Sequence, residues 1–245
     1  MSISPIKSIS LAEPRVEVEK LANGGIILRS PQLLGTYPAS QSAWIEQWAE
    51  RTPDRVFVAD RTGADGTWRE ITYSDLLNKV RAIGQALLNR GLSAERPVAV
   101  ISDNSVDNAL LSFGAMHVGI PVVPISPAYS LMSQDFGKLK FITEWVTPGL
   151  VFAEDGTQFA DALAAVDFGD AEIVVSRHAP ANAEVTEFSS LLSTVATDAV
   201  DDAAKKVTPD TIAKILFTSG STGLPKGVVN TQRMLCSNQV AMAQV

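Results

Sequence analysis

Residues 97–125 read PVAVISDNSVDNALLSFGAMHVGIPVVPI, and two short apolar runs in this stretch enclose a longer segment with helical spacing. The β-branched run at 97–101 and the proline-interrupted run at 120–125 predict strands, and residues 105–118 predict a helix. A strand, a helix and a second strand in this order favour parallel strands joined by a right-handed crossover. The stretch therefore predicts an α/β fold.

The same alternation continues on both sides of this stretch. Upstream, a short helix from Ser40 is expected to end at Thr52-Pro53, because the residue before a proline disfavours the helical region. A second helix begins at a capping box of Thr72 and Asp75 and ends at Gly91. Downstream, we expect helices at 133–143 and 158–166, strands at 150–153, 172–176 and 211–217, and a helix-and-loop region at 181–202. This pattern predicts a mostly parallel sheet with helices on both faces.

The N-terminal residues differ from the rest of the chain. Residues 1–37 have mixed charge, a Gly24-Gly25 turn and no sustained period, so we predict an irregular leader followed by one domain over 38–245.

Composition excludes several classes of function. The 245 residues carry a formal net charge of −7, which argues against a nucleic-acid-binding surface. One cysteine, Cys236, and two histidines, His117 and His178, predict no metal site. We expect His117 to be a packed helix residue and His178 a surface-loop residue.

The chain also shows no sign of a membrane or export segment. No apolar run approaches the roughly 20 residues of a membrane helix, and residues 1–20 lack the basic start and apolar centre of a signal peptide. The sequence predicts a cytoplasmic protein that does not contact membranes.

Residues 218–227, TSGSTGLPKG, follow the predicted strand at 211–217 directly. Glycines allow backbone N–H groups to turn inward, hydroxyls add donors, and a lysine supplies a point charge, so the composition suits a polyanion. Residues 211–245 contain Lys214, Lys226 and Arg233 and no acidic residue. A Walker A loop is excluded because Pro225 and Gly227 replace its second glycine and its Ser or Thr, and the Gly-x-Gly-x-x-Gly dinucleotide pattern is absent.

All ten residues of this loop resemble the phosphate-binding signature of the adenylate-forming (AMP-binding) enzymes, which include acyl-CoA synthetases, peptide-synthetase adenylation domains and luciferases. Weaker matches precede it in the family's order: TPDR at 52–55, ITYSDL at 71–76 and GAMHVGIPVVPISP at 114–127. The resemblance covers about Pro38 to Val245.

The resemblance implies activation of a carboxylic acid by Mg-ATP, with an acyl-adenylate and pyrophosphate as products, followed in most members by transfer to coenzyme A. It implies that the loop residues bind the β- and γ-phosphates: the hydroxyls of Thr218, Ser219, Ser221 and Thr222, and the backbone at Gly220, Gly223 and Gly227. Lys226 is the implied catalytic residue, which orients the triphosphate and stabilises the departing pyrophosphate.

Residues 228–238, VVNTQRMLCSN, are similar to the feruloyl-CoA synthases, which activate hydroxycinnamic acids such as ferulate. A generic acyl-CoA synthetase is the alternative, because a resemblance does not determine the substrate.

In the family, the adenine-pocket motif, the ribose-binding Asp and the C-terminal domain follow the phosphate loop, and none of them is found in these 245 residues. The resemblance therefore implies an incomplete N-terminal domain. Three alternatives stay open: part of a ligase that is inactive alone, half of an enzyme completed by a second chain, or a non-catalytic nucleotide-binding or interaction module.

Overall fold

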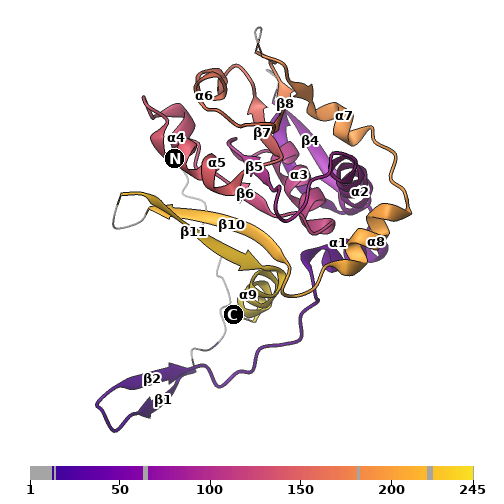
Figure 1. Cartoon of the computed structure of the whole chain (residues 1–245). Coiled ribbons are helices and arrows are strands. Elements are labelled where there is room, and N and C mark those ends of the chain that lie inside the picture. The colour runs from indigo at the N-terminus through magenta and orange to yellow at the C-terminus, as the bar shows by residue number, and fades with distance from the viewer. Residues whose placement is uncertain (1–12, 14, 63–65, 181–182, 220–222, 245) are drawn as a thin grey trace, which may run out of the picture.

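The sheet is mostly parallel, as predicted. The computed structural model describes residues 13, 15–62, 66–180, 183–219 and 223–244. Their main sheet has the strand order β11-β10-β6-β5-β7-β8-β9, in which every neighbouring pair is parallel except β10 and β11 (Figure 1). The strands are β5 (Val98–Val100), β6 (Val122–Pro124), β7 (Leu150–Asp155), β8 (Glu172–Arg177), β9 (Thr186–Glu187), β10 (Ile212–Ser219) and β11 (Pro225–Thr231).

Helices cover both faces of this sheet, and each face has its own apolar cluster. The larger cluster includes side chains from α1 (Gln41–Arg51), α2 (Tyr73–Asn89), α3 (Val106–His117), α7 (Phe188–Leu192) and α8 (Asp198–Lys206). The opposite cluster includes α5 (Gly137–Val146) and α6 (Ala160–Ala165), with α4 (Ala128–Leu131) beside them. The remaining helix, α9 (Gln232–Ala243), follows β11 and packs Leu235 against the larger cluster.

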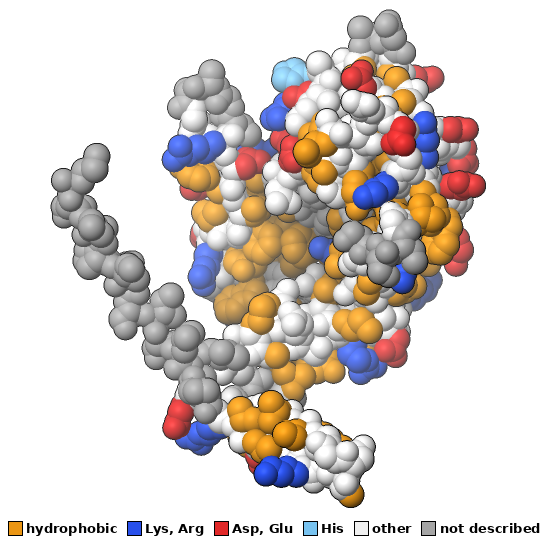
Figure 2. Space-filling model, turned by 90° about the vertical axis from the view of Figure 1, so that its left-hand side faces the viewer, with side chains coloured by type: hydrophobic (Ala, Val, Ile, Leu, Met, Phe, Trp, Pro, Cys, Tyr) orange, Lys and Arg blue, Asp and Glu red, His pale blue; other side chains and the backbone are white. Residues whose placement is uncertain are grey.

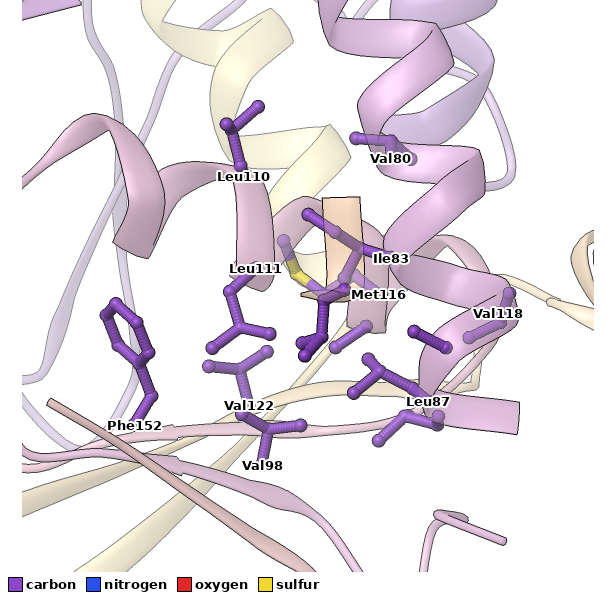
Figure 3. Close-up of a cluster of buried hydrophobic side chains, with 14 of the residues drawn as sticks. Val80, Ile83, Leu87, Val98, Leu110, Leu111, Met116, Val118, Val122 and Phe152 are labelled. Atoms are coloured by element: carbon purple, nitrogen blue, oxygen red, sulfur yellow. The ribbon is translucent and has the colours of Figure 1, made fainter. Parts of the chain in front are cut away.

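The strand–helix–strand unit at 97–125 lies at the centre of the larger cluster. Alternate residues of β5 and β6 face opposite clusters, because successive side chains of a strand point to opposite sides. Figure 3 shows side chains of α2 and α3 above Val98, Val122 and Phe152 of the sheet. The two helices lie close enough that a Cβ on Gly114 would be 2.5 Å from Cγ2 of Ile83.

Local signals predicted the helix ends well. The Thr72 hydroxyl accepts from the Asp75 N–H at 3.2 Å, and the Thr72 N–H donates to the Asp75 carboxylate at 3.4 Å, which confirms the capping box. Gly91 follows the helix with φ of 68°, and α1 starts after Ser40 and ends before Thr52.

Strand pairs near the N-terminus were not predicted. The expected irregular leader is wrong for β1 (Glu17–Lys20) and β2 (Ile26–Arg29), which form an antiparallel hairpin. Both strands are four residues long and almost entirely exposed, so the short alternation of apolar and polar residues at 15–20 did not predict a strand. A second hairpin joins β3 (Val56–Thr62) to β4 (Thr67–Thr72) and leads into α2.

The structure also places the two histidines. His117 is buried at the end of α3, as expected for a packed helix residue, and its side chain is 2% exposed. His178 is exposed after β8 and lies 2.9 Å from a carboxylate oxygen of Asp155. In the part of the chain that the structure describes, no helix is long and apolar enough to cross a membrane.

Candidate functional site

The polar loop is carried by an antiparallel hairpin. β10 and β11 pair with Ser219 opposite Pro225, Thr218 opposite Lys226, and Phe217 opposite Gly227. The predicted strand at 211–217 is confirmed and extends to Ser219. The predicted loop at 218–227 is shorter than expected, because residues 225–231 form β11, and α9 begins after it with Thr231 as its N-cap.

Thr218 and Lys226 are brought together by this register. Directly opposed residues of an antiparallel pair present their side chains on the same face, with Cβ atoms about 4.5–5.5 Å apart. Both residues are exposed. Among the described residues, Lys226 has no hydrogen bond or ion pair, so its ammonium group is free to meet an anion.

Glycine is favoured at two positions near the base of the loop, for a different structural reason at each. Gly223 has φ of 88°, a left-handed conformation that favours glycine. A Cβ on Gly227 would lie 3.3 Å from side-chain atoms of both Ile215 and Phe217, so the neighbouring strand approaches closely there. The predicted site residues Gly220, Ser221 and Thr222 lie outside the described residues.

Of the three cations in the C-terminal segment, only Lys226 lies beside the loop. Arg233 binds Asp210 at 3.0 Å at the other end of the hairpin, so its charge is compensated by an acid just outside that segment. Lys214 is partly buried against α3, and this burial lowers its pKa. The count of positive charges therefore overstated how cationic the loop is.

The remaining candidate groups lie away from the hairpin. Burial, followed by the charge of Arg81, lowers the pKa of His117 to about 4, and neither ring nitrogen has a hydrogen-bond partner. His178 is bound to Asp155 beside β7 and β8. Within the described ranges, no group of three or more His, Cys, Asp or Glu residues is arranged to hold a metal ion. The hairpin thus offers hydroxyl, backbone and ammonium donors, which suit a phosphate chain rather than a bare cation.

One feature of the site was missed by sequence reasoning. Leu216 and Val228 lie next to Thr218 and Lys226 on the same face of the hairpin, and they are 37% and 47% exposed. Figure 2 views the side to which the β10–β11 loop points and shows hydrophobic side chains around a hollow. An apolar surface thus adjoins the polar loop.

Comparisons with known proteins agree with the fold. A family model described as AMP-binding enzyme matches residues 45–245. The chain is 26% identical over 205 residues to the indigoidine synthase of Streptomyces lavendulae, covering 84% of this chain and 14% of that protein. It is 25% identical over 224 residues to the hybrid PKS-NRPS synthetase thnA of Trichoderma harzianum, covering 91% and 5%.

A solved structure supports the fold as well. The fatty acyl-adenylate ligase from L. pneumophila, in complex with acyl adenylate and pyrophosphate, superposes with a TM-score of 0.56 at 19% identity. The match covers 81% of this chain and 31% of that one. The chain thus spans only a small part of the length of the relatives it matches.

Proposed function

Because the chain belongs to the AMP-binding enzyme family, we propose that it takes part in the ATP-dependent activation of a carboxylic acid. The observation that carries this proposal is the β10–β11 hairpin, which sets Thr218 opposite Lys226, a lysine with no partner among the described residues, at the base of a glycine- and hydroxyl-rich loop. Such donors stabilise negative charge on phosphates without themselves reacting.

In the proposed reaction a carboxylate oxygen attacks the α-phosphate of ATP, the α–β phosphoanhydride bond breaks, and pyrophosphate leaves with the electron pair. The hydroxyls of Thr218, Ser219, Ser221 and Thr222 and the backbone at Gly220, Gly223 and Gly227 hold the β- and γ-phosphates. Lys226 keeps the triphosphate oriented and compensates the charge of the pyrophosphate as it leaves.

Mg²⁺ fits this site only as a companion of the nucleotide. Mg²⁺ prefers oxygen ligands and commonly binds through substrate phosphates. The described part of the loop offers hydroxyl oxygens and no carboxylate, so we expect the ion to arrive bound to ATP.

For the acid, we propose an aromatic hydroxycinnamate such as ferulate, with coenzyme A as the acceptor of the acyl group. The resemblance of residues 228–238 to the feruloyl-CoA synthases supports this choice. An amino acid is the second candidate, because a hybrid PKS-NRPS synthetase is among the relatives. In that case the acyl group would not go to coenzyme A.

The chain spans a small share of the length of its relatives. We assign phosphate binding to this chain and propose that the remaining groups come from further sequence or from a second chain. A nucleotide-binding module without catalysis is the competing function.

ATP–pyrophosphate exchange by the chain together with the further sequence or second chain that completes it tests the proposal, with ferulate, p-coumarate, a fatty acid and phenylalanine as separate substrates. Lys226→Ala should lower the exchange rate by about 100-fold, because removing one donor that stabilises developing negative charge commonly lowers the catalytic rate of an enzyme by about this factor. Lys206→Ala is the matched control, since Lys206 is exposed at the end of α8. Exchange that is insensitive to Lys226→Ala would contradict the assignment, and ATP binding without exchange would favour the non-catalytic module.

A further inference from the structure

The segment that leads from β2 to α1 is bound to both ends of α9. We call residues 33–41 the strap, and Figure 1 shows this segment passing α9 on its way to α1. Its hydrogen bonds to α9 and to the residue after it join positions that are 191 to 211 residues apart in the sequence. Because α9 follows β11 directly, the strap is linked to the hairpin that carries the phosphate loop.

Gln244, the residue that follows α9, binds the strap with both ends of its side-chain amide. Its Oε1 accepts from the N–H of Gly35 at 2.9 Å, and its Nε2 donates to the carbonyl of Leu33 at 3.1 Å. A Cβ on Gly35 would lie 3.3 Å from Cγ1 of Val240, so the backbone of the strap approaches α9 closely. Two bonds from one side chain fix both the position and the orientation of the strap.

Gln232, the first residue of α9, holds the other end of the strap. It is fully buried, and its Oε1 accepts from the N–H of Gln41 at 3.0 Å. Gln41 is the first residue of α1, and the N-cap, Ser40, makes no side-chain cap bond. Since the first N–H groups of a helix have no partner within the helix, Gln232 supplies one to α1. The start of α9 is therefore bonded to the start of α1.

The first turn of α9 is also bonded to the base of the β10–β11 hairpin. The N–H of Gln232 donates to the carbonyl of Thr211 at 3.0 Å, and the N–H of Arg233 donates to the carbonyl of Pro209 at 2.7 Å. In the described part of the chain a single register pair joins β10 to β6. The attachments of α9 thus add to this one pair in holding the hairpin to the rest of the chain.

We propose that the strap positions the phosphate-binding hairpin by holding α9 to α1, with Gln232 and Gln244 as positioning residues. The role in phosphate binding rests on the proposed function, whereas the attachment itself does not. While the strap is bound, the base of the hairpin is fixed, and Thr218 and Lys226 keep one position relative to the sheet. Release of the strap loosens the base, and donors stabilise charge best when they are held in place before the ligand arrives.

Hydrogen exchange of the chain without nucleotide tests the attachment. Removing one hydrogen bond commonly changes an equilibrium constant by about 5-fold. Gln244→Ala should therefore speed the exchange of the amides of β10, β11 and α9 by about 5-fold, and Gln244→Ala combined with Gln232→Met by about 10-fold or more. These amides should still exchange by a local opening, faster than those of β5 and β7.

Two controls separate the strap from a general loss of stability. Gln239→Ala changes the same residue type at an exposed position of α9, and among the described residues Gln239 has no bond to the strap, so its hairpin amides should exchange as in the unaltered chain. The amides of α6, on the opposite face of the sheet, are the internal reference, and none of the variants should change their exchange.

A disulfide can replace the lost bonds. Gly35→Cys with Val240→Cys places two thiols where the strap lies closest to α9, at a spacing that suits a disulfide. In the Gln244→Ala background, the oxidised protein should exchange its hairpin amides as slowly as the unaltered chain does, and reduction should restore the fast exchange. The native cysteine, Cys236, is buried and does not compete.

ATP–pyrophosphate exchange by the completed enzyme tests the role in positioning. Gln244→Ala should raise KM for ATP by about 3-fold with little change in kcat, because ATP must now order the base of the hairpin as it binds. The oxidised disulfide should return KM to its original value. Lys226→Ala differs, since it lowers the exchange rate itself.

Several results would overturn the proposal. One is unchanged hydrogen exchange of β10 and β11 in the variant that combines Gln244→Ala with Gln232→Met, and another is an oxidised disulfide that does not slow this exchange. Faster hydrogen exchange with an unchanged KM would overturn the assignment of Gln232 and Gln244 as positioning residues. If no acid supports pyrophosphate exchange, the proposed function fails, and hydrogen exchange alone decides whether the strap holds the hairpin.

Discussion

The centre of the sheet and the β10–β11 hairpin at its edge differ in how deeply their side chains are buried. Around β5, side chains such as Leu111 and Phe152 are fully buried. On the hairpin, Thr218, Lys226 and Val228 are exposed, and Lys226 is left unpaired among the described residues. The difference indicates that packing determines the first region, and it agrees with our proposal that the second binds phosphates.

The largest contrast should come from shortening one side chain in each region. Phe152→Ala removes a fully buried ring that lies 5.4 Å from the ring of Phe188, and should lower the free energy of unfolding by about 3–5 kcal/mol. Val228→Ala, at a residue 47% exposed, should change it by less than about 0.5 kcal/mol. Urea unfolding followed by circular dichroism measures both, and equal losses would remove the distinction between the regions.

Acid should weaken the packed region through His117. Its pKa in the folded chain is about 4, below its ordinary value of 6.5, because burial disfavours the charged ring. The unfolded chain therefore takes up the proton first, and stability is lost as the pH falls from about 7 to about 4, by roughly 3 kcal/mol.

The matched variant His117→Leu removes this titration while keeping an apolar side chain. Its unfolding free energy, measured across the same pH range, should fall less steeply than that of the unaltered chain. Parallel pH profiles for the two proteins would show that protonation of His117 does not cause the loss of stability in acid.

Glycine-to-alanine substitutions compare how closely neighbouring elements pack against the backbone in the two regions. Gly114→Ala should destabilise the chain by about 1–3 kcal/mol, since the new Cβ would lie 2.5 Å from Ile83 between two packed helices. Gly227→Ala places its Cβ 3.3 Å from Ile215 and Phe217, at a hairpin with more room to adjust, so a smaller loss is expected. Thermal unfolding ranks the pair, and a larger effect at Gly227 would show the hairpin to be the more rigid element.

The smallest effects should come from helix caps. Thr72→Ala removes the bond that the Thr72 hydroxyl accepts from the N–H of Asp75 and the bond that it donates to the Asp75 carboxylate, and should cost about 1 kcal/mol. Thr231→Ala removes one longer bond, 3.4 Å from the N–H of Met234, at the start of α9. Its cost should be lower, and denaturant midpoints that reverse this order would mean that α9 depends on its cap more than α2 does.

Sequence patterns predicted the packed region closely and the exposed region incompletely. The strands and helix within 97–125 were found because burial imposes a period on the residues. The hairpin of β1 and β2 was missed because its side chains face solvent on both sides, and β11 was missed because Lys226, Gly227 and Asn230 give the segment the composition of a loop.

The site was predicted by motif rather than by period. The motif named Thr218 and Lys226, and the register of β10 and β11 then set them opposite each other. A pocket between α3, β3 and the start of β10 is lined by both Lys214 and Asp60, and it could not be foreseen, since these residues are 154 positions apart and only the tertiary structure brings them to one cavity. In the sequence Lys214 counted only as one of several local charges.

The way β10 joins the sheet has a consequence for motion. One register pair, Lys214 with Val122, attaches β10 to β6, whereas β10 and β11 are paired along their whole length. The hairpin can therefore separate from β6 as a unit while β5 stays paired with β6 and β7. Amide hydrogens of β10 and β11 should then exchange with solvent by a local opening that is faster than global unfolding, with the hinge of the opening near residue 214.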